Sequence, residues 1–280
     1  MSTRPYAPGQ RGVDSGGIVF FRNGYSGWRS GYQGSSFIEL LGEDAQHLAP
    51  NFEALAQGSI EEIPHGTTVC SFKFSDGVVM AGDRLATAGH SVASREVQKV
   101  FATDTHSMIA IAGAAGPAIE MARVLSVELE HYEKIEGERL ELDGKANKLS
   151  QMIRQNLPAA MQGLAVVPLF AGYDLRRRVG RIWQYDITGG RYEEGNAETS
   201  GSGGLYAQEH IKKTWREGMS AQDALDVAVG AITAAADEDR ATGGIDLDRG
   251  IFPIVDVCTE AGITRATDDE VLPSYERLRS

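Results

Sequence analysis

Residues 66–83 decide the fold, and they read GTTVCSFKF, SDG and VVMAGD in succession. The first part is β-branched and aromatic, which is typical of a strand, and Ser-Asp-Gly is a hairpin turn signal. The third part predicts a return strand that ends at Asp83. An antiparallel hairpin therefore brings Asp83 back beside Thr67, the residue that starts the first strand. Many strands begin with threonine, so only this spacing draws attention to Thr67.

A second charge follows at the start of the next predicted strand, where Lys99 lies 16 residues after Asp83. Charged side chains at the ends of apolar strands need partners, because an unpaired buried charge is costly. We therefore predict that Asp83 and Lys99 form an ion pair beside Thr67.

The rest of the chain alternates groups of strands with pairs of amphipathic helices. The predicted helices are 117–136, 145–162, 205–215 and 221–237, and the further strands are 99–103, 107–112, 164–173, 181–186, 251–258 and 263–266. Residues 164–173 are almost entirely apolar, as in a strand that is covered on both faces. This order predicts an α+β fold, a four-layer α/β/β/α sandwich in which helix pairs cover a double sheet.

Residues 1–66 differ in composition from residues 67–280. They hold 11 of the 33 glycines and no lysine, and few apolar residues that could form a core. Two short amphipathic patches, residues 37–41 and 52–55, are predicted to dock on a partner surface. We therefore expect the chain to divide into an N-terminal segment, 1–66, and a globular domain, 67–280.

Bulk properties exclude several classes of function. The formal net charge of −12 argues against a nucleic-acid-binding protein. No apolar run is long enough to cross a bilayer, and the N-terminus lacks the order of a secretory signal. Cys70 and Cys258 fit buried, reduced thiols, and no Cys or His spacing suggests a metal. We expect a cytoplasmic protein without a metal or cofactor.

Several segments together resemble the proteasome β family. The matching segments are 66–69, 79–84, Lys99, 111–113, 201–204 and 239–244. Residues 128–134, 171–174 and 249–253 resemble the actinobacterial branch, and the long N-terminal segment also fits that branch. The resemblance covers about residues 67–265, and it implies an N-terminal-nucleophile hydrolase fold and threonine endopeptidase activity.

The family's catalytic roles carry over to positions that match its motifs. Thr67 would be the nucleophile and its freed α-amine the base, since an α-amine titrates near pH ~8. The amine becomes free only when the Gly66–Thr67 bond is cut, which the family does autocatalytically. The remaining implied site residues are Asp83, Lys99, Asp239, Ser202 and Thr242, with the Gly113 N–H as the oxyanion donor.

Substrate recognition is implied at a second group of residues. Thr87 would hold the substrate backbone as an added strand. A small apolar pocket, which would accept bulky apolar side chains before the cut, would be lined by Ala86, Val97, Ile111 and Ala115. The same four residues could instead belong to the core. The sequence departs from the family at Leu85, where many members carry arginine, and neighbouring Arg84 receives no catalytic role.

The resemblance also implies partners. The expected particle has two inner rings of seven β subunits between two rings of α subunits, works with an ATPase regulator and degrades unfolded proteins. Two alternatives remain: an assembly subunit that keeps residues 1–66 and never cleaves, and an N-terminal-nucleophile amidase that acts on small molecules. Residues 1–66 could promote ring assembly or only block the amine.

Overall fold

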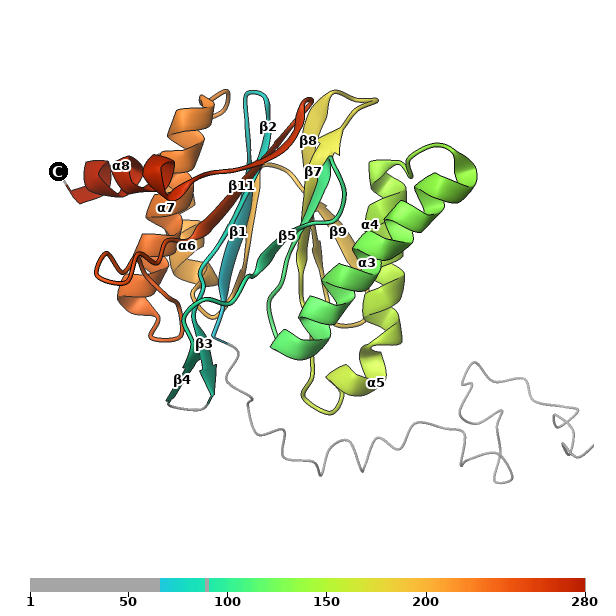
Figure 1. The fold of residues 1–280 in the computed structure, drawn as a ribbon, viewed down its shortest axis with the longest axis horizontal. Helices are drawn as coiled ribbons and strands as arrows, with labels where there is room; N and C mark the ends of the chain where they lie inside the picture. Colours follow the sequence, from blue (N-terminus) through green and yellow to red (C-terminus); the bar gives the residue numbers. More distant parts are fainter. Residues whose placement is uncertain (1–65, 89–90, 280) are drawn as a thin grey trace, which may run out of the picture. The chain divides into compact units, whose positions relative to one another are not determined.

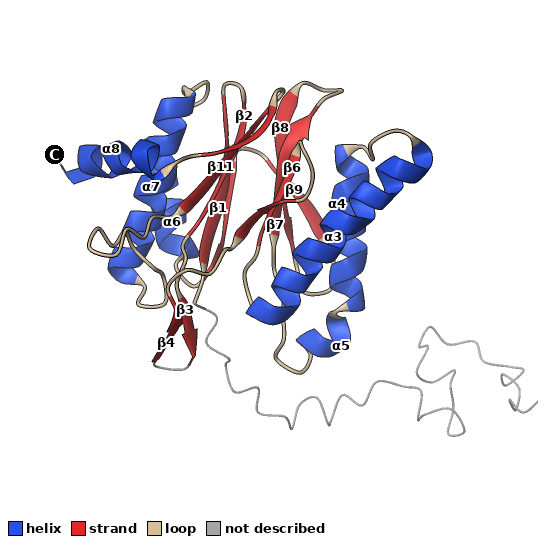
Figure 2. Ribbon diagram, in the orientation of Figure 1, coloured by secondary structure: helices blue, strands red, loops and turns tan. Residues whose placement is uncertain are grey.

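The computed structural model describes residues 66–88 and 91–279. These residues belong to one compact unit that runs from Ser59 to Ser280. Its described part is built of two stacked sheets with helices on both outer faces (Figure 1; Figure 2). The patches predicted at 37–41 and 52–55 lie outside the described residues. The four-layer α/β/β/α sandwich predicted from the sequence is confirmed.

The first sheet has the strand order β10-β1-β2-β11-β12, and each pair of neighbours is antiparallel. Its strands are β1 (Thr68–Phe74), β2 (Gly77–Gly82), β10 (Ala197–Gly201), β11 (Ile254–Thr259) and β12 (Gly262–Arg265). The predicted hairpin is β1 and β2, joined at the turn around Asp76. The strand that carries the candidate nucleophile at its start therefore lies inside the sheet, between two neighbours.

The second sheet has the order β5-β6-β7-β8-β9 and is also antiparallel. Its strands are β5 (Val100–Ala102), β6 (Ser107–Ala110), β7 (Leu169–Asp174), β8 (Val179–Tyr185) and β9 (Arg191–Glu194). A separate two-stranded hairpin consists of β3 (Ala86–Ala88) and β4 (Ser91–Ser94).

Helices cover the outer face of each sheet (Figure 1). On the second sheet lie α3 (Ala115–Glu136) and α4 (Leu142–Gln155), followed by the short α5 (Leu157–Ala160). On the first sheet lie α6 (Gly204–Thr214), α7 (Ala221–Glu238) and α8 (Asp268–Arg279). Ser220 caps α7 in a capping box with Asp223, which fixes where this helix begins. None of the helices that the structure describes combines the length and apolarity needed to cross a bilayer.

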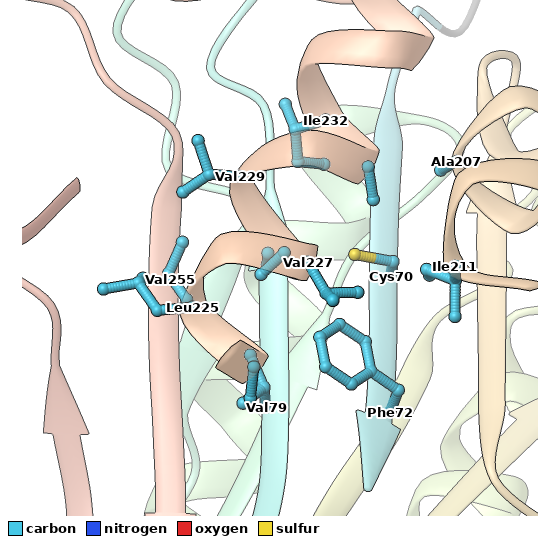
Figure 3. Packing of buried hydrophobic residues seen from close by; sticks show 14 of the residues in the cluster. Cys70, Phe72, Val79, Ala207, Ile211, Leu225, Val227, Val229, Ile232 and Val255 are labelled. Carbon is cyan, nitrogen blue, oxygen red and sulfur yellow. The ribbon is translucent and has the colours of Figure 1, made fainter. Parts of the chain in front are cut away.

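The period of two in β1 divides its side chains between two cores. Cys70, Phe72 and Phe74 pack against α6 and α7, as Figure 3 shows for Cys70 and Phe72. Val69 points the other way, into the layer between the two sheets. Both cysteines are buried and free, as predicted, and burial raises the pKa of the Cys70 thiol to about 12.

Two predicted elements differ from the structure by more than three residues at one end. The strand predicted over 164–173 begins only at Leu169, because pairing with β6 starts there and Pro168 has no N–H to donate. The helix predicted over 145–162 is α4 followed by α5, and Pro158 lies in the first turn of α5, where proline is tolerated.

Candidate active site

Thr67 directly precedes β1, and the neighbouring strands β2 and β10 bring other site residues close to it. In the β1–β2 hairpin Val69 pairs with Gly82, so the next residue, Asp83, lies beside the start of β1. On the other side Thr68 pairs with Gly201, the last residue of β10. The predicted return of Asp83 to Thr67 follows from this register.

Asp83 is fully buried, and its carboxylate accepts four hydrogen bonds. Oδ1 accepts from the Thr68 backbone N–H at 2.8 Å and from Lys99 Nζ at 2.7 Å. Oδ2 accepts from the backbone N–H groups of Leu85 and Gly243, each at 2.9 Å. The buried charge is thus paired and hydrogen-bonded, which is what makes such burial tolerable.

Lys99 is 3% exposed, and its ammonium group donates to three oxygens. These are Asp83 Oδ1, the Leu85 carbonyl at 2.6 Å and the Gly66 carbonyl at 3.1 Å. All three N–H bonds of the ammonium group are therefore used. Burial lowers the pKa of Lys99, and the charge of Asp83 opposes this shift.

Leu85 takes part through its backbone alone. Its N–H donates to Asp83 and its carbonyl accepts from Lys99, while its apolar side chain is buried. The leucine that departs from the family pattern therefore leaves these contacts intact. Neighbouring Arg84 donates to the Glu96 carbonyl at 3.4 Å.

The bond between Gly66 and Thr67 lies in the middle of these contacts. Thr67 Oγ1 donates to the Gly66 carbonyl oxygen at 2.6 Å, so that oxygen accepts from both Thr67 and Lys99. Gly66 is buried, and a Cβ built on it would lie 2.6 Å from both the Cβ and the carbonyl oxygen of Ala241. Only glycine fits at this position without a shift of the 239–244 loop.

A second carboxylate, that of Asp239, is hydrogen-bonded to Ser202 beside Thr67. Asp239, which follows α7, accepts from Ser202 Oγ at 2.5 Å and from Thr242 Oγ1 at 2.6 Å. Ser202 Oγ in turn accepts from the Thr67 N–H at 3.4 Å. Partial burial would raise the pKa of Asp239, but these hydroxyl donors and the Ala241 N–H hold the pKa below its ordinary value. Asp239 is therefore a carboxylate at neutral pH.

The backbone N–H of Gly113 takes no part in the hydrogen bonding of either sheet. Gly113 forms an isolated antiparallel bridge with Val166. The hydrogen bonds of this bridge are made by the residues on either side: the Ala114 N–H donates to the Ala165 carbonyl, and the Val167 N–H donates to the Ala112 carbonyl. In such a pair the N–H groups of Gly113 and Val166 point away from each other. The φ of Gly113 is +107°, and a Cβ there would lie 2.2 Å from the Ala165 carbonyl oxygen. Glycine is thus required for this backbone geometry.

Thr67, Lys99 and Gly113 all line one cavity of about 270 Å³. The five predicted substrate-binding residues line it as well, namely Ala86, Thr87, Val97, Ile111 and Ala115. The structure therefore brings every predicted site residue to this cavity or to the two carboxylate networks beside it. Their catalytic and binding roles stay predictions.

Other contributors were missed by reasoning from the sequence. The cavity is also lined by Ala114, Gly116, Pro117 and Leu164, besides the predicted cleavage residue Gly66. Ala114 and Gly116 flank the predicted Ala115, and that proximity was the only signal for them. The N–H groups of Leu85 and Gly243 could not be found from residue types, since any residue can supply a backbone donor. The described residues hold no group of three or more His, Cys, Asp or Glu side chains that could bind a metal.

A four-layer α/β/β/α sandwich with a threonine directly before the first strand of one sheet has the fold of the N-terminal-nucleophile hydrolases. Comparison with known proteins narrows this class. A family described as Proteasome subunit matches residues 63–247. The chain therefore belongs to the proteasome subunit family, as a bacterial β subunit.

Named relatives support this assignment. The chain is similar to the proteasome subunit beta of Streptomyces griseus, with 52% identity over 238 residues and 84% of each chain covered. It is 51% identical over 235 residues to that of Acidimicrobium ferrooxidans, covering 84% of this chain and 85% of the relative. It is 50% identical over 242 residues to that of Acidothermus cellulolyticus, covering 85% and 83%. The family's β subunits are threonine peptidases as a class and assemble with other subunits into a proteasome particle.

Proposed function

We propose that this chain is an active threonine endopeptidase that frees its own nucleophile by cutting the Gly66–Thr67 bond. Residues 1–66 would then be a removable pro-segment, and 67–280 the catalytic domain. The pair of hydrogen bonds on the Gly66 carbonyl oxygen, from Thr67 Oγ1 at 2.6 Å and Lys99 Nζ at 3.1 Å, carries the proposal. The nucleophile and a cation meet at the bond that must break.

Self-cleavage begins when Thr67 Oγ attacks the Gly66 carbonyl carbon. Rotation about χ1 of Thr67 turns Oγ from the carbonyl oxygen toward that carbon. The Lys99 ammonium group polarises the carbonyl and stabilises the oxyanion as it forms. The α-amine is still an amide at this stage, so a water molecule takes the hydroxyl proton, which ends on the leaving nitrogen.

The C–N bond then breaks and leaves an ester between Gly66 and Thr67 Oγ. Water hydrolyses this ester, giving a carboxylate on Gly66 and a free amine and hydroxyl on Thr67. One water molecule is consumed. The freed amine can now act as a base for its own hydroxyl, because an α-amine titrates near pH ~8. The Asp239–Ser202 network, which reaches the Thr67 nitrogen at 3.4 Å, orients it.

The same groups would serve peptide cleavage. A substrate carbonyl would place its developing oxyanion at the Gly113 N–H, a type of donor whose loss costs roughly 3 kcal/mol in the transition state. The side chain before the cut would enter the cavity of about 270 Å³, whose lining is largely small and apolar. This lining favours bulky apolar residues at that position.

In the cell we expect the chain to work in the cytoplasm, inside a particle in which two rings of seven β subunits lie between two rings of α subunits. An ATPase regulator would supply unfolded protein. The buried triad of Thr67, Asp83 and Lys99 argues against a non-cleaving assembly subunit, which has no use for all three. The apolar lining of the cavity and the glycine–serine loop at 201–204 favour a peptidase over an amidase for small molecules.

An electrophile that needs both an amine and a hydroxyl tests the proposal. The chain is purified with α subunits, treated with a peptide epoxyketone and analysed by intact and peptide mass spectrometry. We expect a chain that begins at Thr67 and carries the label there, and no label on Thr67→Ala. A full-length chain that persists in the assembled particle would refute self-activation and would favour the assembly subunit.

A further inference from the structure

Leu164 lines the same cavity as Thr67, although the sequence predicted this leucine inside a buried strand. The residue is 39% exposed and lines the cavity. A single exposed leucine has no special meaning on a protein surface. This leucine differs because its apolar surface faces the space that a substrate side chain would occupy.

The backbone that presents Leu164 is fixed on both sides. The Leu164 N–H donates to the Ala159 carbonyl at 3.0 Å, and its carbonyl accepts from Asn156 Nδ2 at 3.2 Å. The next residue, Ala165, accepts from the Ala114 N–H at 2.8 Å. Leu164 is thus tied to the segment that holds Gly113, and a side chain on a fixed backbone can contribute to specificity.

Backbone contacts place Leu164 at one particular wall of the cavity. Gly113 is opposite Val166 in an antiparallel bridge. The hydrogen bond from the Ala114 N–H to the Ala165 carbonyl holds the two segments together beside this bridge, and Leu164 and the predicted pocket residue Ala115 both line the cavity there.

The other residues of this wall offer little apolar surface. Ala114, Ala115 and Gly116 have a methyl group or no side chain. Leu164 is therefore the largest apolar group that this wall contributes beside Pro117. A substrate side chain that covers Leu164 removes apolar surface of both partners from water.

We propose that Leu164 is a specificity-determining residue, which contacts a bulky apolar side chain immediately before the cleaved bond. This inference rests on the proposed peptidase function, and it adds a residue from the loop between α5 and β7 to the predicted pocket.

The test compares Leu164→Ala with Leu247→Ala in particles assembled with α subunits. Leu247 is a matched control, since it is 52% exposed and does not line the cavity. Two fluorogenic peptides are used, identical except for leucine or alanine before the cut, and kcat/KM is measured for each. We expect Leu164→Ala to lower the leucine-to-alanine ratio about tenfold, and Leu247→Ala to leave it unchanged.

Each outcome is decisive. If the parent cleaves the peptides and both variants keep its ratio, Leu164 does not determine specificity and the peptidase function stands. If the parent cleaves neither peptide, the proposed function fails and this inference fails with it. Should Leu164→Ala not assemble, Leu164→Val removes one carbon and should lower the ratio about fourfold. An unchanged ratio in that variant also overturns the inference.

Discussion

Replacing Asp83 with asparagine should destabilise the chain strongly although the two side chains have nearly the same shape. The Asp83 carboxylate is fully buried, and each of its oxygens accepts two hydrogen bonds. Asparagine keeps one oxygen and replaces the other with an NH₂ donor. Whichever way the amide is turned, two of the four surrounding donors then face another donor.

The size of the effect follows from these contacts. If the amide oxygen faces Thr68 and Lys99, the N–H groups of Leu85 and Gly243 lose their acceptor, at about 1–3 kcal/mol each. Lys99 also loses the charge that compensates its own, and breaking a buried ion pair costs about 3–5 kcal/mol. These costs overlap, because the amide oxygen still accepts from Lys99. We expect the free energy of unfolding to fall by about 4 kcal/mol.

Denaturant unfolding of four purified chains measures this loss: a parent, Asp83→Asn, Lys99→Met and the double variant. All four carry Thr67→Ala, so none cleaves itself during the measurement. Lys99→Met removes the unpaired charge, so the double variant should be more stable than additivity predicts, by at least about 1.5 kcal/mol. The reasoning is refuted if Asp83→Asn unfolds within about 1 kcal/mol of the parent or if the two losses simply add.

Three further changes test other parts of the site. Gly66→Ala places a Cβ 2.6 Å from the Ala241 carbonyl oxygen, so self-cleavage followed by intact mass should slow about tenfold or more; cleavage at the parental rate would contradict this. Gly113→Ala places a Cβ 2.2 Å from the Ala165 carbonyl oxygen at a residue whose φ is +107°. We expect it to lower the free energy of unfolding by about 1–3 kcal/mol, measured as a lower Tm. An unchanged Tm would argue against this strain. For Asp239→Asn, the loss of unfolding free energy relative to the parent should be constant above about pH 4. It should shrink as pH falls toward the lowered pKa of Asp239, because protonation removes the stability that the ionised carboxylate contributes. A loss that stays constant down to acid unfolding would count against an ionised Asp239.

The strands and helices that the sequence predicted well are those with an apolar period. The β1–β2 hairpin carries both a β-branched pattern and a turn signal, and α7 carries a capping serine. In contrast β9 and β10 read RYEE and AETSG and are mostly half-buried, so no alternation indicates them. Helix α8 buries few residues and contains Pro273, which argues against a helix in any sequence pattern.

Some residues of the candidate site could likewise be predicted from the sequence, and others could not. Thr67, Asp83 and Lys99 could be found because charges beside strand ends are unusual and their spacing matches a hairpin. The donors from Leu85 and Gly243 could not, since their backbone N–H groups leave no trace in residue identity. Leu164 was assigned to a strand because its neighbours are apolar, and only the tertiary structure separates a rim residue from a core residue.

The contacts of Thr68 decide how a chain end would behave if the proposed cleavage made one at Thr67. The first residues of a polypeptide usually fray, because nothing precedes them. Here the second residue of a chain that begins at Thr67 is fully buried. Its N–H donates to Asp83 at 2.8 Å, its hydroxyl meets that of Thr242 at 2.6 Å and its backbone pairs with Gly201. A terminus made by the proposed cleavage would therefore be anchored one residue from its tip, and the freed amine would remain where the amide had been.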